Sequence, residues 1–128
     1  MNWQRAHWLV GVLALVAFLL SGQYMLRVAG VSHLDSVPRL IFRSRHLFIL
    51  VAGVANLALS TGRPLKLAQK AASLLILVAP FLLTAAFFLD PARGPRSSEL
   101  FHFAMYGVFT AGVLIAFSTW PGSRPPNA

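Results

Sequence analysis

Apolar residues fill four long stretches of the chain, and short polar segments separate these stretches. An α-helix rises about 1.5 Å per residue, so about 20 apolar residues cross the roughly 30 Å hydrocarbon layer of a membrane. The pattern therefore predicts an all-α protein, a bundle of four transmembrane helices in one domain of residues 1–121. The predicted spans are residues 8–26, 37–61, 65–89 and 98–120, and a disordered polar tail follows at 122–128.

The second span depends on the residues that precede its apolar run. The run itself, residues 47–60, is too short to cross a bilayer. Asp35 can cap a helix, and Pro38 fits a first turn because the amide hydrogen it lacks has no helical partner there. We therefore expect the segment from Asp35 to Arg45 to be helical and continuous with the apolar run, without a sharp bend at Ser44.

The composition supports a protein that resides in a membrane. Hydrophobic residues make up 57% of the 128 residues and charged residues only 11%, whereas about a quarter of a soluble domain is charged. The chain has no cysteine, which excludes disulfide relays, iron–sulfur clusters and thiolate zinc sites. We expect a multi-pass protein of a bacterial inner membrane.

The net charge of +8 comes from basic residues that lie near the ends of the predicted spans. Anionic lipid headgroups, and not nucleic acid, are the expected partner of such residues. The residues expected among the headgroups are Arg39, Arg43, Arg45, Lys66 and Lys70. Basic residues are divided almost equally between the two sides, so the positive-inside rule does not choose an orientation. Because the number of spans is even, we expect both termini in the cytoplasm.

Small and polar residues at helical spacing predict the inward faces of the helices, because lipid provides no hydrophobic reason for helices to associate. We expect Asn56 to point into the bundle and Pro80 to kink the third helix. The predicted inward positions are Gly11, Ala14, Phe18 and Ser21; His46, Ile49, Gly53, Asn56 and Ser60; Ser73, Leu77, Pro80 and Thr84; and His102, Tyr106 and Thr110.

The acidic residues argue against transport and catalysis. Proton- or cation-coupled transport needs a titratable carboxylate within the membrane, and Asp35, Asp90 and Glu99 all lie outside the apolar runs of the predicted spans. The chain also has no hydrolase, metalloprotease or phosphate-loop motif. The expected function is that of a non-catalytic bundle, an accessory or assembly subunit that associates with itself or with a larger membrane complex.

Two histidines suggest an alternative function in redox chemistry. His46 and His102 begin the second and fourth spans on the same side of the membrane, as two axial ligands of haem b iron would. Arg39, Arg43 and Arg45 could then bind the haem propionates. The same side chains together with Tyr106 could instead hydrogen-bond to the carbonyl oxygens of a quinone.

Two short segments carry a resemblance to a known group of proteins. They are residues 21–25, with the sequence SGQYM, and residues 43–50, with the sequence RSRHLFIL, which lead into NLAL at 56–59. In these segments the chain resembles small four-helix bacterial inner-membrane proteins. The resemblance covers the first half of the chain and implies the four-helix architecture, but no substrate.

Overall fold

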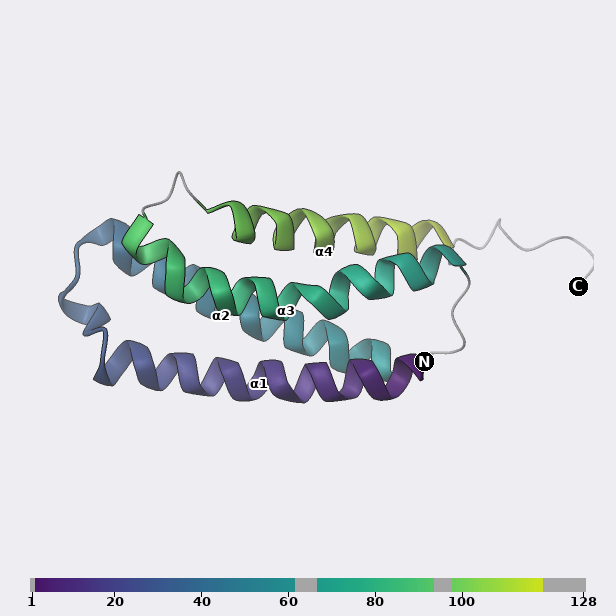
Figure 1. The fold of residues 1–128 in the computed structure, drawn as a ribbon, viewed down its shortest axis with the longest axis horizontal. Helices are drawn as coiled ribbons and strands as arrows, with labels where there is room; N and C mark the ends of the chain where they lie inside the picture. Colours follow the sequence, from purple (N-terminus) through teal and green to yellow (C-terminus); the bar gives the residue numbers. More distant parts are fainter. Residues whose placement is uncertain (1, 62–66, 94–97, 119–128) are drawn as a thin grey trace, which may run out of the picture.

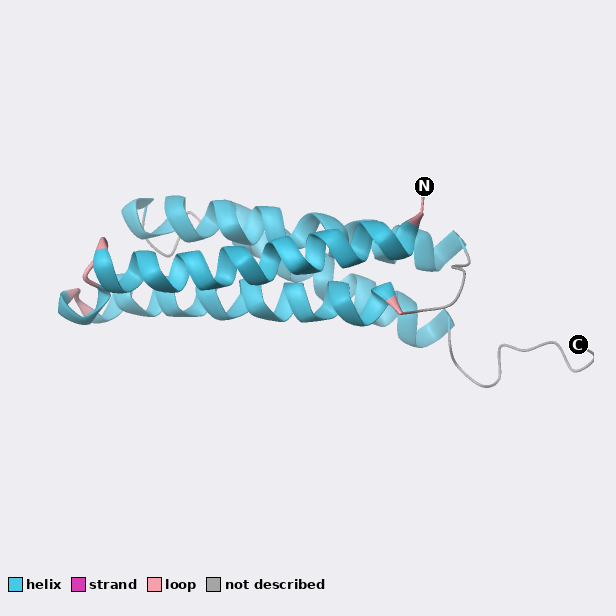
Figure 2. Cartoon of the chain, turned by 90° about the horizontal axis from the view of Figure 1, so that it is seen from below, coloured by secondary structure: helices cyan, strands magenta, loops and turns pink. Residues whose placement is uncertain are grey.

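The computed structural model describes residues 2–61, 67–93 and 98–118, and these residues are helical apart from short connections. The elements are α1 (Trp3–Arg27), the 3₁₀ turn η1 (Val31–His33), α2 (Ser36–Ser60), α3 (Leu67–Arg93) and α4 (Glu99–Ser118). Four helices in this part of the chain are long and apolar enough to cross a membrane. They lie side by side and alternate in direction, so α1 begins and α4 ends at the same end of the bundle (Figures 1 and 2). The prediction of an all-helical structure with four helices of membrane-spanning length is confirmed.

The starts of the helices follow from capping residues. The Asn2 side chain accepts a hydrogen bond from the Arg5 amide at the start of α1. Asp35 occupies the N-cap position of α2, although its side chain makes no capping hydrogen bond, and Pro38 lies in the first turn as predicted. Between α1 and η1 the backbone turns at Gly30, whose φ of +53° is in the left-handed region that glycine adopts without steric cost.

Helix α2 runs without interruption from Ser36 to Ser60. The arginine-bearing segment and the apolar run therefore form one helix, which confirms the continuity predicted from the sequence. The predicted tail at 122–128 lies outside the described residues.

Helix α3 is longer than the sequence suggested. The predicted third span ends at residue 89, before Asp90-Pro91, but α3 continues to Arg93. The expectation was wrong because proline removes only one amide donor, and helix already formed on its N-terminal side can continue for a short distance. The extension makes Asp90 part of the helix, with its side chain only 2% exposed.

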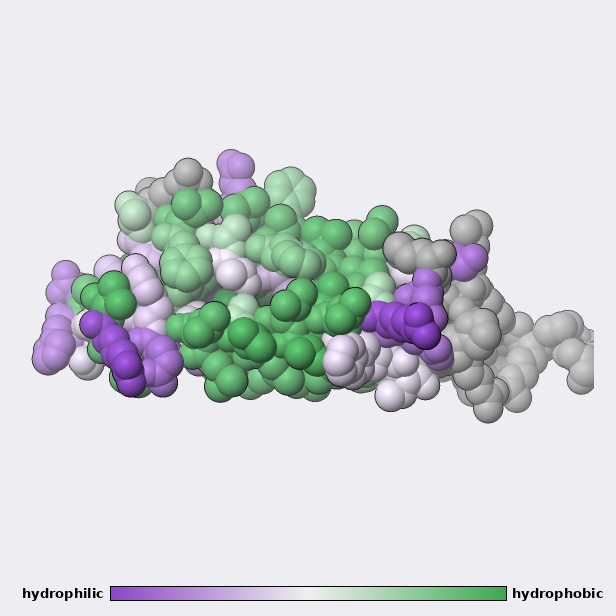
Figure 3. All heavy atoms as spheres, turned by 60° about the horizontal axis from the view of Figure 1, so that its bottom comes forward, coloured by the Kyte–Doolittle hydropathy of each residue, from purple (hydrophilic) through white to green (hydrophobic). Residues whose placement is uncertain are grey.

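The two middle helices in the chain are also the most enclosed. Half of the apolar stretch of α3 is buried, but only 11% of the apolar stretch of α4 is. Helix α4 packs mainly against α3 and lies on the side of the bundle away from α1 (Figure 1). The molecular surface shows a hydrophobic belt between two hydrophilic ends (Figure 3). This distribution of surface is the one that a lipid bilayer would match.

Close contacts between α1 and α2 depend on small residues. A Cβ atom at Gly11 would lie 2.7 Å from Leu57 Cγ, and one at Gly53 would lie 3.1 Å from Ala14 Cβ. These positions were predicted to face inward and do so, as do most predicted positions of α2 and α3. Small residues of this kind let helix backbones approach in a membrane bundle.

The inward face predicted for α4 was wrong. His102, Tyr106 and Thr110 are exposed, whereas Ala104 and Ala111 are buried against the rest of the bundle. Both sets recur at helical spacing, so periodicity alone does not choose between them. Short alanine side chains allow α4 to lie close to α3, and the larger aromatic and polar side chains consequently face outward.

Candidate functional site

Two clusters of buried polar side chains connect the helices, one toward each end of the bundle. The first, here called the His7 cluster, consists of His7 in α1, Asn56 in α2 and Ser73 in α3, each at most 1% exposed. His7 Nδ1 lies 2.7 Å from Asn56 Oδ1. His7 Nε2 forms a hydrogen bond with Ser73 Oγ. The cluster therefore joins three helices through a single imidazole.

The donors and acceptors of the His7 cluster can be assigned from its connections. Asn56 Nδ2 donates to the carbonyl oxygens of Ala52 and Ile76, both at 2.9 Å. Asn56 Oδ1 must therefore face His7 and accept from the hydrogen on Nδ1. In a neutral imidazole Nε2 is then an acceptor, so the Ser73 hydroxyl donates to it. All three side chains are satisfied when His7 is uncharged.

Asn56 also compensates for a proline in α3. In an unbroken helix the amide of residue 80 would donate to the carbonyl oxygen of Ile76, four residues earlier. Pro80 has no amide hydrogen, and the Asn56 side chain donates to that oxygen instead. The kink predicted at Pro80 has a counterpart in the bowed course of α3 (Figure 1). A neighbouring helix thus supplies the hydrogen bond that Pro80 removes, as is typical of helices in membranes.

The second cluster, here called the Arg45 cluster, contains an ion pair. Arg45 Nε donates to Asp90 Oδ2 at 3.0 Å, and the same oxygen accepts from Ser98 Oγ at 2.8 Å. Another guanidinium nitrogen donates to Ser98 Oγ. The guanidinium also lies over the Phe101 ring, with Cζ 3.8 Å from the ring centroid. These contacts connect α2, the end of α3 and the beginning of α4.

The Arg45 cluster changes two interpretations made from the sequence. Arg45, expected among lipid headgroups, is only 7% exposed and is directed into the bundle. Asp90, expected outside the spans, lies within α3 and is buried. The expectation that no span contains an acid is therefore wrong. The pairing also gives the acid a structural function, since a buried carboxylate needs a counter-charge and hydrogen bonds.

His46 lies against α1. Its ring stacks on Phe18 with centroids 4.0 Å apart, and Nδ1 lies 2.9 Å from Ser21 Oγ. Because the Ser21 hydroxyl donates to the Phe18 carbonyl oxygen at 2.9 Å, His46 Nδ1 is the donor to Ser21. A Cβ atom at residue 22 would lie 3.2 Å from His46 Cε1, so Gly22 provides room for the ring. Asn56 and His46, ten residues apart on α2, thus both bind α1.

His46 and His102 are not brought together. His46 faces α1, whereas His102 is exposed on α4 and stacks against Tyr106 with ring centroids 6.3 Å apart. Helices α1 and α4 lie on opposite sides of the bundle (Figure 1). This arrangement does not present the two imidazoles to one haem or one quinone within a single chain. No group of three or more metal-ligating side chains occurs among the described residues either.

The remaining basic residues named from the sequence lie at the surface or outside the described residues. Arg43 and Lys70 are exposed, which leaves them able to contact lipid headgroups. Arg39 is half-buried and donates to the Leu34 carbonyl oxygen before α2. Lys66 lies in a part of the chain that the structure does not describe. The expected headgroup contacts of these residues stay a prediction.

Comparisons with protein-family models, with curated proteins and with solved structures find no match to this chain. The residues themselves therefore carry the functional argument. Sequence reasoning identified Asn56 and Ser73 as inward-facing but missed their partner His7, and it also missed Asp90 as the partner of Arg45. The sequence does indicate that His7 and Asp90 have partners, because a histidine and an acid near the ends of apolar helices need polar partners.

Proposed function

We propose that this protein is a four-span integral membrane protein that acts as a non-catalytic accessory or assembly subunit. The hydrophobic belt and the lengths of the helices support insertion into a bilayer. The buried polar groups support a structural function: among the described residues, every buried side-chain nitrogen and oxygen has a hydrogen-bond partner. Groups used fully in holding helices together are not free to bind a substrate.

The observation that carries the assembly part of the proposal is the outer face of α4. His102, Tyr106 and Thr110 recur every four residues on this face and are exposed. Lipid chains offer no hydrogen-bond partner to imidazole or hydroxyl groups, so polar residues in spans usually face protein. Gly112 is exposed as well, at the edge of this face, and a Cβ atom there would meet nothing within 4 Å. The face therefore has the features of a surface that another transmembrane helix covers.

The absence of cysteine makes a direct test simple, because each introduced cysteine is the only thiol in the chain. Gly112→Cys places a thiol on the outer face of α4, and the matched control Ala111→Cys places one against the bundle, where residue 111 is fully buried. We expect oxidation in native membranes to cross-link the Gly112→Cys chain but not the control. Failure of both variants to form any cross-linked product, with a monomer after mild detergent extraction, would overturn the proposal.

A second variant keeps the test specific. Replacing His102, Tyr106 and Thr110 together with leucine removes the polar groups but leaves the face apolar. The cross-link through residue 112 should then be lost, while the melting temperature of the extracted protein stays the same. An absorption spectrum of the same preparation tests the redox alternative, since a Soret band abolished by His46→Ala or His102→Ala would favour haem binding over assembly.

A further inference from the structure

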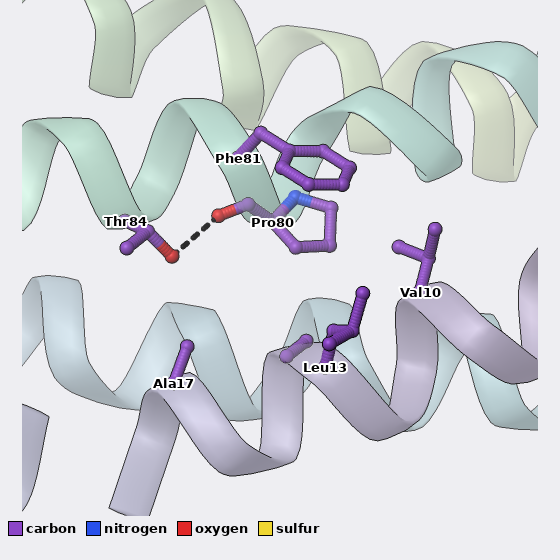
Figure 4. A pocket seen from close by; sticks show the side chains of 7 residues that line it. Val10, Leu13, Ala17, Pro80, Phe81 and Thr84 are labelled. Atoms are coloured by element: carbon purple, nitrogen blue, oxygen red, sulfur yellow. Dashed lines mark hydrogen bonds between the residues drawn. The ribbon is translucent and has the colours of Figure 1, made fainter. Parts of the chain in front are cut away.

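A hollow lies between α1 and α3 in the middle of the bundle. Its volume is about 210 Å³, and its lining consists of Val10, Leu13, Ala14 and Ala17 from α1 and Pro80, Phe81 and Thr84 from α3. Val10, Leu13 and Ala17 point toward α3, and Pro80 and Thr84 point back toward α1 (Figure 4). The hollow exists because the two alanines are too short to reach the opposite helix.

Contacts on both sides of the hollow hold the two helices apart at a fixed distance. Toward the beginning of α1, His7 hydrogen-bonds with Ser73 of α3. Toward the end of α1, the Tyr24 ring meets the Phe87 and Phe88 rings edge-on, with centroids 6.0 and 5.2 Å away. Since the lining residues fall between these two contacts, the hollow is a preformed feature of the fold.

The chemistry of the lining selects an apolar occupant. Its single side-chain hydroxyl, that of Thr84, already donates to the Pro80 carbonyl oxygen at 2.7 Å (Figure 4). Pro80 has no amide hydrogen, and the Ile76 carbonyl oxygen that it leaves unpaired accepts from Asn56. A quinone carbonyl or a haem propionate would find no free donor here, and burial of such a group without a donor is costly.

The depth and the rim of the hollow indicate where the occupant comes from. Residues 10–17 and 80–84 lie near the middle of α1 and α3, so in the proposed membrane orientation they lie near the bilayer midplane. Leu13 and Phe81 at the rim are 58% and 57% exposed, which opens the hollow sideways toward lipid. Apolar cavities of about 150 Å³ in soluble proteins accept guests of the size of benzene, so this one has room for several carbon atoms of a chain.

We infer that this hollow binds the terminal part of one hydrocarbon chain of a bilayer lipid, which enters laterally at the midplane. The inference rests on the proposed insertion into a membrane. The bound chain fills the space that Ala14 and Ala17 leave open and contributes dispersion contacts between α1 and α3. The protein is then a four-helix bundle that contains one lipid chain as part of its packing.

Native mass spectrometry of the protein released from mild detergent provides the first test. We expect the wild-type chain to retain one lipid molecule. Ala17→Phe, which fills the hollow from α1, and Thr84→Leu, which fills it from α3, should each lose that molecule. The matched control Val16→Phe adds the same ring at an exposed neighbouring position and should retain it. Equal lipid retention in all four proteins would overturn the inference.

A fluorescence measurement separates failure of the inference from failure of the membrane proposal. The three natural tryptophans are replaced with phenylalanine, and one reporter is introduced, either Phe81→Trp at the rim of the hollow or Val51→Trp at an exposed position near the middle of α2. In bilayers of lipids brominated near the chain ends, both reporters should be quenched. Adding Ala17→Phe should reduce quenching of the residue 81 reporter only.

The outcomes of this measurement are distinct. If neither reporter is quenched by these lipids, the proposed four-span insertion fails. If the residue 51 reporter is quenched but Ala17→Phe does not change the residue 81 reporter, no lipid chain occupies the hollow. If the residue 81 reporter is protected even without Ala17→Phe, a second copy of the chain or another protein covers the hollow, and the inference is wrong.

Discussion

The Asn56 side-chain amide donates to the main-chain carbonyl oxygen of Ile76 on the neighbouring helix, at 2.9 Å. This oxygen is the one that Pro80 deprives of its helical partner. Asn56 also accepts from His7, so one side chain satisfies a broken helix and connects α1, α2 and α3. Polar residues in membrane bundles commonly hydrogen-bond one helix to another. Here the acceptor on the second helix is a backbone carbonyl oxygen that a proline leaves without its helical partner.

Asn56→Leu should destabilise the bundle. The substitution leaves the His7 Nδ1 hydrogen and the Ile76 carbonyl oxygen without partners, and a buried unsatisfied polar group costs about 1 to 3 kcal/mol. Unfolding by denaturing detergent, followed by circular dichroism, measures the free energy of unfolding. Ser60→Ala is the control, because the Ser60 hydroxyl donates only to Leu57 of its own helix. Equal stability of the two variants would contradict the function assigned to Asn56.

Pro80→Ala should partly rescue Asn56→Leu. Alanine restores an amide hydrogen that can donate to the Ile76 carbonyl oxygen, so the double variant leaves one polar group fewer without a partner than Asn56→Leu does. The double variant should therefore have a higher free energy of unfolding than Asn56→Leu alone. The same unfolding assay on the wild type, the two single variants and the double variant gives the coupling energy between Asn56 and Pro80. Strictly additive effects would show that Asn56 and Pro80 do not act on the same oxygen.

Removing the Arg45 or the Asp90 side chain alone should lower the free energy of unfolding more than removing both together. Arg45→Met leaves a buried carboxylate without its counter-charge, and Asp90→Leu leaves a buried guanidinium; each loss typically costs about 3 to 5 kcal/mol. The double variant buries no charge and should recover much of that loss. Arg43→Met is the control, since Arg43 is an exposed neighbour on the same helix. A double variant less stable than both single variants would argue against a structural ion pair.

Gly11→Ala should destabilise the contact between α1 and α2. The added methyl group would lie 2.7 Å from Leu57 Cγ and 3.0 Å from the Leu57 backbone nitrogen, so the helices must move apart. Overpacking of this kind costs about 1 to 3 kcal/mol. Gly107→Ala is the matched control, because a methyl group added there would lie 3.9 Å from the nearest atoms of Leu75. A melting temperature equal to that of Gly107→Ala would show that α1 and α2 are not in close contact at Gly11.

The helices themselves could be predicted well from the sequence because each depends on local features. Apolar length determined the spans, and Asp35 and Pro38 located the start of α2 where the structure has it. Inward faces of the first three helices followed from residues such as Gly53 and Asn56, whose small or polar side chains have few alternatives in an apolar environment.

The connections between helices could not be predicted, because they depend on pairs of residues far apart in the chain. Asp90 was placed outside the third span by its proximity to Pro91, and only the packing of α2 against α3 shows that it meets Arg45. The partners of His7 could not be recognised because Asn56 and Ser73 are 49 and 66 residues away in the chain. On α4, two sets of residues share one periodicity, and contact with α3 decides which set is buried.

The Arg45 ion pair also constrains the order in which the chain can be made and inserted. Synthesis produces Arg45 well before Asp90, which lies 45 residues later. If the chain is inserted as proposed above, a second helix that enters the bilayer before the third carries a guanidinium without its counter-charge. Asp90 on α3 supplies that charge, so the proposal implies that α2 and α3 insert together.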